Sequence, residues 1–179
     1  MVRPGHVRCG QSHDQLARGV GGPETVLPGA TRPRDLPAPG RDLEGVHFAM
    51  EFLTGQNRLI AGEAQSLAIH AENKRVIVIG GGDTGSDCIG TSHRQRAAAV
   101  VNFELLPQPT DTRPPSQPWP YWPMRLRTSS SHEEGGRRHW NVLTRRFIGE
   151  NGRLTGLETV SVEWAEKNGR PVKFTEVSG

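Results

Sequence analysis

Apolar residues gather in two short runs in the middle of the chain, and each run has the length of a strand. The segment 75–79 (RVIVI) is rich in β-branched residues and is flanked by polar residues and glycines, which is typical of a buried parallel strand. A helical pattern follows at once, and residues 98–106 predict a second strand that ends before Pro107. Strand, helix and strand in this order predict a right-handed βαβ unit.

The chain ahead of this unit is less regular. Residues 1–24 have neither strand-like nor helix-like periodicity, so we expect them to be disordered or poorly packed. Residues 29–41 combine prolines with charged residues, which favours an extended surface connection. Apolar residues at helical spacing in 45–59 predict a short amphipathic helix that ends before Ile60.

The last third of the chain has the pattern of a small antiparallel sheet. Asn-Gly pairs at 151–152 and 168–169 lie between alternating runs, and such pairs are the strongest short-range sign of a β-hairpin. Between the two parts, residues 108–124 mix prolines with aromatic residues and predict a docked loop. We therefore expect a three-stranded meander at about 143–148, 154–164 and 171–177.

Together these elements predict an α/β fold: a Rossmann-like βαβ nucleotide-binding domain with an antiparallel β-meander and a disordered N-terminal segment. We divide the chain into a poorly ordered, atypical N-terminus at 1–28, a connecting region at 29–73, and the nucleotide-binding domain at 74–179.

Composition narrows the possible functions. The sequence is 34% hydrophobic with 22 Gly and 14 Pro, so the core should be small and the loops extensive. The net charge is only +3 without a dense run of Lys or Arg, which argues against a nucleic-acid partner. Its two cysteines lie far apart without metal-ligand spacing, so we expect no metal site. No apolar run nears the roughly 20 residues that span a bilayer, and the N-terminus lacks a signal-peptide core. We expect a cytoplasmic protein without membrane contact.

A glycine motif lies where the first predicted strand meets the helix. Gly80, Gly82 and Gly85 follow the G-x-G-x-x-G pattern, in the strand-to-helix context that the pattern requires. The first glycine permits a tight turn, the second lets backbone approach a pyrophosphate, and the third allows close packing of helix and strand. We expect a dinucleotide ligand; the alternative is a tight turn that binds nothing.

Two kinds of residue bear on the choice between NADH and NADPH. Glu104 lies 19 residues after Gly85 (104 minus 85), where an acidic residue would bind a ribose 2′-OH. Arg94 and Arg96 fall at the C-terminal end of the helix, where they would either contact a 2′-phosphate or compensate the helix dipole. This pattern does not decide between NADH and NADPH.

No acid–base pair for catalysis emerges from the sequence. The cluster His132-Glu133-Glu134 is typical of a solvated helix start, and Cys88 of a small packing residue. We therefore predict no catalytic side chain, and the chemistry would reside in a cofactor.

Six segments, in order, are similar to one protein family, the small (beta) subunit of glutamate synthase, from about residue 29 to residue 178. They are GATRPRDLPAPGR (29–41), GVHFAMEFL (45–53), VIVIGGGDTGSDCIGTS (76–92), FELLPQP (103–109), PWPYWP (118–123) and LRTSSSHEEG (126–135).

The resemblance implies a flavoprotein of the pyridine-nucleotide-disulfide-reductase-like class, with a nucleotide domain inserted into an FAD domain. Electrons would pass from NADPH through FAD and iron–sulfur clusters to the large (alpha) subunit, where 2-oxoglutarate and glutamine-derived ammonia become glutamate. Residues 29–31 resemble the chain crossing near the flavin, so 29–73 would be part of the FAD-domain crossover and its connecting helix. The cofactor-binding residues carried over by position are Gly80, Gly81, Gly82, Asp83, Thr84, Gly85 and Arg94, with Glu104 added from its spacing.

The chain also departs from the family. It lacks the cysteine-rich iron–sulfur region, the first FAD-binding glycine motif and the C-terminal GD-containing segment. We therefore expect an internal fragment, truncated at the C-terminal end of its NAD(P)H domain, that holds neither FAD nor iron–sulfur clusters. Its role would be hydride transfer from NADPH, favoured over NADH through Arg94. The alternative is an inactive remnant or a nucleotide-binding module without FAD or catalysis.

Overall fold

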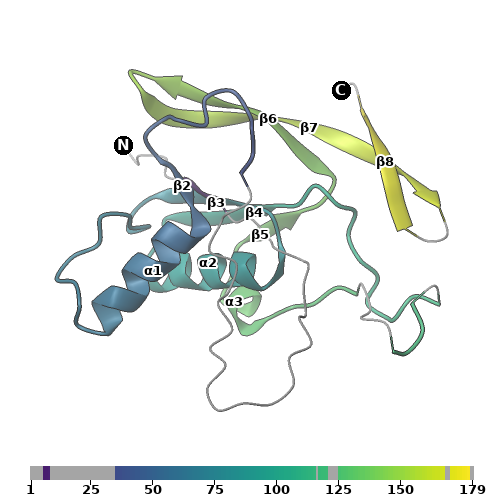
Figure 1. Cartoon of the computed structure of the whole chain (residues 1–179), viewed down its shortest axis with the longest axis horizontal. Helices are drawn as coiled ribbons and strands as arrows, with labels where there is room; N and C mark the ends of the chain where they lie inside the picture. The colour runs from purple at the N-terminus through teal and green to yellow at the C-terminus, as the bar shows by residue number, and fades with distance from the viewer. Residues whose placement is uncertain (1–5, 9–34, 116, 121–124, 168–169, 178–179) are drawn as a thin grey trace, which may run out of the picture.

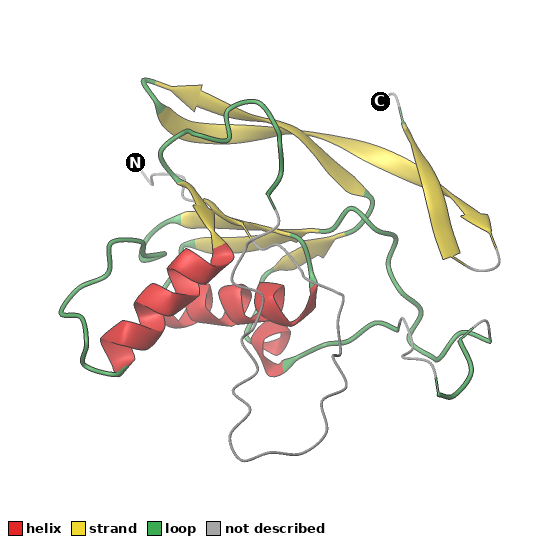
Figure 2. Cartoon of the chain, in the orientation of Figure 1, coloured by secondary structure: helices red, strands yellow, loops and turns green. Residues whose placement is uncertain are grey.

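The structure is a computed structural model, and it describes residues 6–8, 35–115, 117–120, 125–167 and 170–177. The expectations for the remaining N-terminal residues up to 34 lie outside this description. The described elements form three layers, in which a parallel sheet lies between helices on one face and an antiparallel sheet on the other (Figures 1 and 2).

The predicted βαβ unit is confirmed at the centre of the parallel sheet. It consists of β3 (Arg75–Ile79), α2 (Gly82–Arg94) and β4 (Ala99–Phe103). The two strands pair in parallel, from Arg75 opposite Ala99 to Ile79 opposite Phe103. The second strand is shorter than the predicted 98–106, because the chain bends at residues 105 and 106.

Three further strands complete a five-stranded parallel sheet in the order β2-β1-β3-β4-β5. They are β1 (His6–Arg8), β2 (Val46–Phe48) and β5 (Arg137–His139). The first of them is a strand that the sequence did not predict, and it pairs with strands on both sides. A three-residue strand is too short to show an alternating pattern, so the sequence did not reveal it.

The helix predicted at 45–59 is confirmed, but its first and last residues differ from the prediction. Residues 46–48 form β2, and α1 (Ala49–Ile60) begins after them and includes Ile60. Val46 and Phe48 satisfy a helical spacing and a strand alternation equally well, and pairing with β1 decides between them. At the start of the helix, the backbone N–H of Phe48 donates to the Glu51 carboxylate at 3.3 Å.

The main core lies between the parallel sheet and the helices. Phe52 of α1 and Val78 of β3 are fully buried there, and Cys88 of α2 packs beside them, as expected of a small packing residue. The buried members of this core are Ala49, Phe52, Ala71, Val76, Val78, Cys88, Ile89 and Val100.

The three strands of the meander are confirmed on the opposite face, whereas the Asn-Gly pair at 168–169 lies outside the described residues. The antiparallel strands are β6 (Val142–Glu150), β7 (Arg153–Lys167) and β8 (Arg170–Glu176). Asn151 and Gly152 both adopt positive φ, at 51° and 76°, as the two-residue turn of an Asn-Gly hairpin requires. A second core of Ala38, Phe147 and Leu154 attaches the meander to the sheet through Ile79.

The loop expected to be docked is only partly described, and its described part differs from the expectation. Trp119 is exposed, whereas Gln117 is buried. Past the loop, α3 (Ser130–Glu133) confirms a helix at the His132 cluster.

Within the described ranges, no helix is long and apolar enough to cross a membrane, and His, Cys, Asp and Glu do not gather into a group of three that could hold a metal ion.

Candidate functional site

The glycine motif forms the turn between β3 and α2. Gly80 and Gly82 adopt positive φ, at 102° and 78°, which side chains of L-residues strain to reach. Gly81 is the N-cap of the 13-residue helix and has no side chain to cap it. The first turn of the helix therefore has no side-chain cap, and its dipole favours an anion there. Gly85 is buried in that turn, Thr84 is partly exposed and Asp83 is exposed.

One buried side chain, Asn102, fixes the turn from the neighbouring strand. Its Nδ2 donates to the backbone carbonyl of Val78 at 3.0 Å and to that of Gly80 at 2.8 Å. The Gly80 N–H also donates to the Phe103 carbonyl at 2.8 Å. Both backbone polar groups of Gly80 are thus bonded to β4. We did not predict this role, although an Asn within the otherwise apolar run AVVNF was a signal for it.

Glu104 lies directly against the glycine turn. A Cβ added to Gly81 would fall 2.5 Å from the Glu104 carboxyl carbon and 2.8 Å from its Oε1. Only glycine fits at position 81 with the carboxylate in this place. The structure therefore brings together Glu104 and the turn, although they are distant in sequence.

Arg138 of β5 holds the other side of the Glu104 carboxylate. Its Nη2 lies 3.0 Å from Glu104 Oε1, and the two side chains are only 18% and 17% exposed. Its Nη1 donates to the Arg127 carbonyl at 3.1 Å, and its guanidinium lies 5.0 Å from the centroid of the Trp140 ring. Sequence reasoning missed this arginine, because β5 is too short to be recognised and no motif points to it.

Arg94 is not brought to the turn. It is the last residue of α2, so about 12 residue rises, or roughly 18 Å, separate it from Gly82 along the helix. There its Nη1 pairs with Glu134 Oε1 at 2.6 Å, and its side chain is 59% exposed. Arg96 follows the helix with a φ of 60°. These positions fit the alternative that the two arginines compensate the dipole at the C-terminal end of α2.

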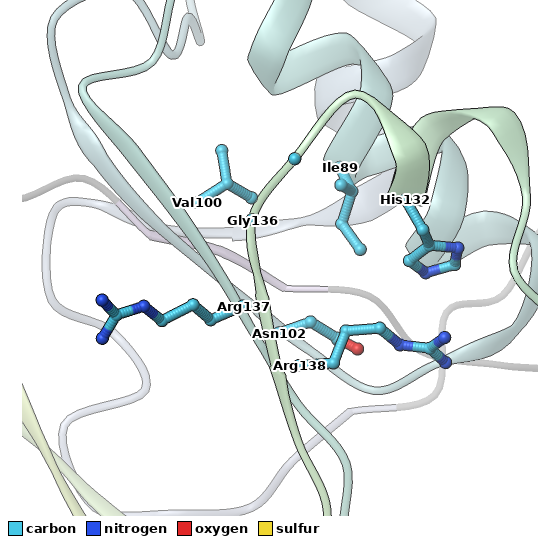
Figure 3. Close-up of a pocket in the computed structure, with 8 residues that line it drawn as sticks. Ile89, Val100, Asn102, His132, Gly136, Arg137 and Arg138 are labelled. Carbon is cyan, nitrogen blue, oxygen red and sulfur yellow. The ribbon is translucent and has the colours of Figure 1, made fainter.

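A small cavity lies beside Asn102 (Figure 3), between α2, β4 and the segment that leads into β5. Its volume is about 30 Å³, which suits water-sized groups and not a dinucleotide. Asn102 Oδ1 and Arg138 Nε are buried around it. His132 also lines it; burial lowers the pKa of this histidine, and the charge of Arg138 lowers it further. His132 is therefore partly buried beside the cavity, not solvated as expected.

Comparison with known proteins agrees with the motifs. No family model matches the chain. It is 48% identical over 156 residues to the glutamate synthase (NADPH) small chain of Mycobacterium tuberculosis (strain ATCC 25618 / H37Rv), covering 84% of this chain and 31% of that protein. It is 41% identical over 157 residues to the glutamate synthase (NADH) of Saccharomyces cerevisiae, and the match covers 83% of this chain and 7% of that protein. It is 36% identical over 160 residues to the glutamate synthase (NADPH) small chain of Bacillus subtilis, and the match covers 84% of this chain and 32% of that protein.

These similarities identify the chain at two levels. It belongs to an oxidoreductase family. That family is glutamate synthase, and the segment it matches is part of the small chain. The chain spans about a third of the length of these small-chain relatives.

Proposed function

We propose that this chain binds a nicotinamide dinucleotide at the turn 80–85 and is the nucleotide-binding part of a cytoplasmic glutamate synthase small chain. The observation that carries the proposal is the turn itself: two glycines with positive φ between a parallel strand and the start of a 13-residue helix, with Glu104 against Gly81. The parallel pairing of β3 and β4, with this turn and α2 between them, supports a Rossmann-like unit.

Each part of the site has a role in this proposal. The N–H groups at the start of α2 bind the pyrophosphate, and the absence of a Cβ at Gly82 leaves room for it. Asp83 and Thr84 belong to the same first turn of the helix. Glu104, at the end of β4, faces the adenosine ribose. Arg94 lies at the other end of α2 and pairs with Glu134, so it has no role in this proposal.

Bound NAD(P)H supplies a hydride. In the whole protein we propose that FAD receives it, and that the electrons reach a large subunit through iron–sulfur clusters to make glutamate from glutamine and 2-oxoglutarate. Relatives named as NADPH and as NADH glutamate synthases support a nicotinamide nucleotide at this site.

The substitution Gly82→Val tests the site. A β-branched side chain would occupy the space that the pyrophosphate needs, so we expect titration calorimetry to detect no binding of NADH or NADPH. Gly62→Val is the matched control, because Gly62 has a similar positive φ of 76° and open space around it. It imposes the same backbone strain away from the turn and should leave affinity unchanged. Unchanged affinity in Gly82→Val, with the fold checked by circular dichroism, would exclude the turn as the site.

A second candidate is a nucleotide-binding module without FAD or catalysis, and the glycine turn with Glu104 against Gly81 fits it equally well. The two candidates agree on the nucleotide and differ on the flavin. A flavin-binding measurement therefore separates them.

A further inference from the structure

We propose that Arg138 determines whether the site accepts NADPH as well as NADH. This inference rests on the proposed function, because it concerns the ribose end of the same site. Glu104 alone would favour a ribose 2′-OH and repel a 2′-phosphate. Its carboxylate is paired with Arg138 at 3.0 Å, so a cation already lies where a 2′-phosphate would have to be recognised.

Arg138 is held in place by more than Glu104. The Arg127 carbonyl accepts from its Nη1 at 3.1 Å, and the Trp140 ring lies 5.0 Å below its guanidinium. These two contacts do not involve the carboxylate. The guanidinium therefore keeps its position when Glu104 turns away, and it offers a preformed cation to another anion.

The Glu104–Arg138 pair can bind either nucleotide. With NADH, Glu104 keeps its place and accepts a hydrogen bond from the 2′-OH, while Arg138 balances its charge. With NADPH, the 2′-phosphate takes the place of the carboxylate on Arg138, whose planar fork suits phosphate as well as carboxylate. With only 17% and 18% of the two side chains exposed, solvent screens this exchange weakly. Arg138 is thus required for NADPH and dispensable for NADH.

The neighbouring cations do not offer the same contact. Arg94 pairs with Glu134 at the far end of α2. Arg137, the preceding residue of β5, is exposed and extends in the opposite direction to Arg138 in Figure 3. His132 lines the cavity beside Arg138, and its pKa is lowered by burial, so it is mostly neutral at neutral pH.

The test compares Arg138→Met with Arg94→Met in the full chain, titrating each with NADH and NADPH at one ionic strength. Both variants remove one positive charge and one Arg–Glu pair, but only the first is at the glycine turn. We expect Arg138→Met to weaken NADPH binding on the order of 10- to 100-fold, the scale of one hydrogen bond to a charged group, and NADH binding by less than about twofold on the same scale. Arg94→Met should change neither.

The outcomes separate the possible roles of Arg138. Equal losses for both nucleotides would make it merely structural, and a larger loss for NADH would mean that it only positions Glu104; either result overturns the proposal. If Arg94→Met selectively weakened NADPH binding, the 2′-phosphate would be assigned to Arg94, and the proposal would be overturned as well. Glu104→Gln adds a check that does not depend on the stability of Arg138→Met: NADPH should bind more tightly and NADH more weakly. A wild-type chain that binds neither nucleotide would instead overturn the proposed function itself.

Discussion

At the scale of single residues, the glycine turn depends on a polar side chain buried in an apolar strand. Asn102 is 1% exposed, and burying an amide is costly unless its hydrogen bonds are made. Its two bonds to backbone carbonyls at the end of β3 satisfy the N–H groups of this amide, whereas Oδ1 is buried without a hydrogen-bond partner among the described residues. They also fix the carbonyl of Gly80, and with it the direction of the N–H groups that follow in the turn.

We expect Asn102→Ala to weaken both stability and nucleotide binding. Losing two hydrogen bonds should lower the free energy of unfolding by about 1–3 kcal/mol, from about 0.5–1.5 kcal/mol for each, and an unfixed turn should bind less tightly. Ser92→Ala is the matched control, because Ser92 is also fully buried and its Oγ donates to the Cys88 carbonyl at 2.7 Å, away from the turn. Denaturant unfolding should reveal a loss in both variants, whereas calorimetry should detect weaker binding only in Asn102→Ala. Equal affinities in the two variants would refute the positioning role.

The sequence predicts some of the site residues but not others, for a physical reason. Glycines that adopt positive φ at a strand-to-helix turn form a local pattern, so the turn was predictable. Glu104 was predictable through its spacing from Gly85, since a helix and a strand of usual length bring it back to the turn. Arg138 reaches Glu104 from a strand that begins 33 residues later (137 minus 104), and only the tertiary fold specifies that contact.

At the scale of elements, length separates the predicted strands from the missed ones. The strands β3, β4, β6 and β7 have five or more residues and local signals such as β-branched runs or an Asn-Gly turn. The strands β1, β2 and β5 have three residues each, and their pairing partners, not their own composition, make them strands. The position of α3 against the cavity likewise depends on tertiary packing, because His132 lines the cavity together with residues of β4 and β5.

The packing of α3 predicts a dependence of stability on pH. Burial lowers the pKa of His132 below its usual 6.5, and burial also lowers the pKa of His47 beside α1. Between the folded and the unfolded pKa, the unfolded chain binds more protons, so the free energy of unfolding falls as pH drops below about 6.5. We expect a lower melting temperature at pH 5.5 than at pH 7.5, and a smaller difference in His132→Asn, whose amide oxygen can still accept from the Ser129 N–H. A melting temperature that rises on acidification would contradict this sign.

At the scale of the whole molecule, one parallel sheet carries two cores. The helices cover one face with the core around Phe52 and Val78, and the meander covers the other with the core around Phe147 and Leu154. The order of the elements around the βαβ unit was predictable from the sequence. The three-layer arrangement was not, because it requires the strands that are too short to recognise. The G-x-G-x-x-G pattern occurs once in the sequence, at the carboxyl end of β3, where parallel sheets bind nucleotides.

One turn of this kind holds one dinucleotide, so the chain should bind a nicotinamide nucleotide and not also FAD. After incubation of the purified chain with excess FAD and gel filtration, we expect the protein fraction to have no flavin absorbance near 450 nm, about where free flavin absorbs, whereas NADH or NADPH should still give a binding isotherm. Flavin that elutes with the protein would contradict this prediction, and a competition experiment then locates it. Displacement by NADPH would mean that FAD occupies the turn 80–85, and flavin retained beside bound NADPH would mean that the chain forms a second site and can itself pass a hydride between the two cofactors.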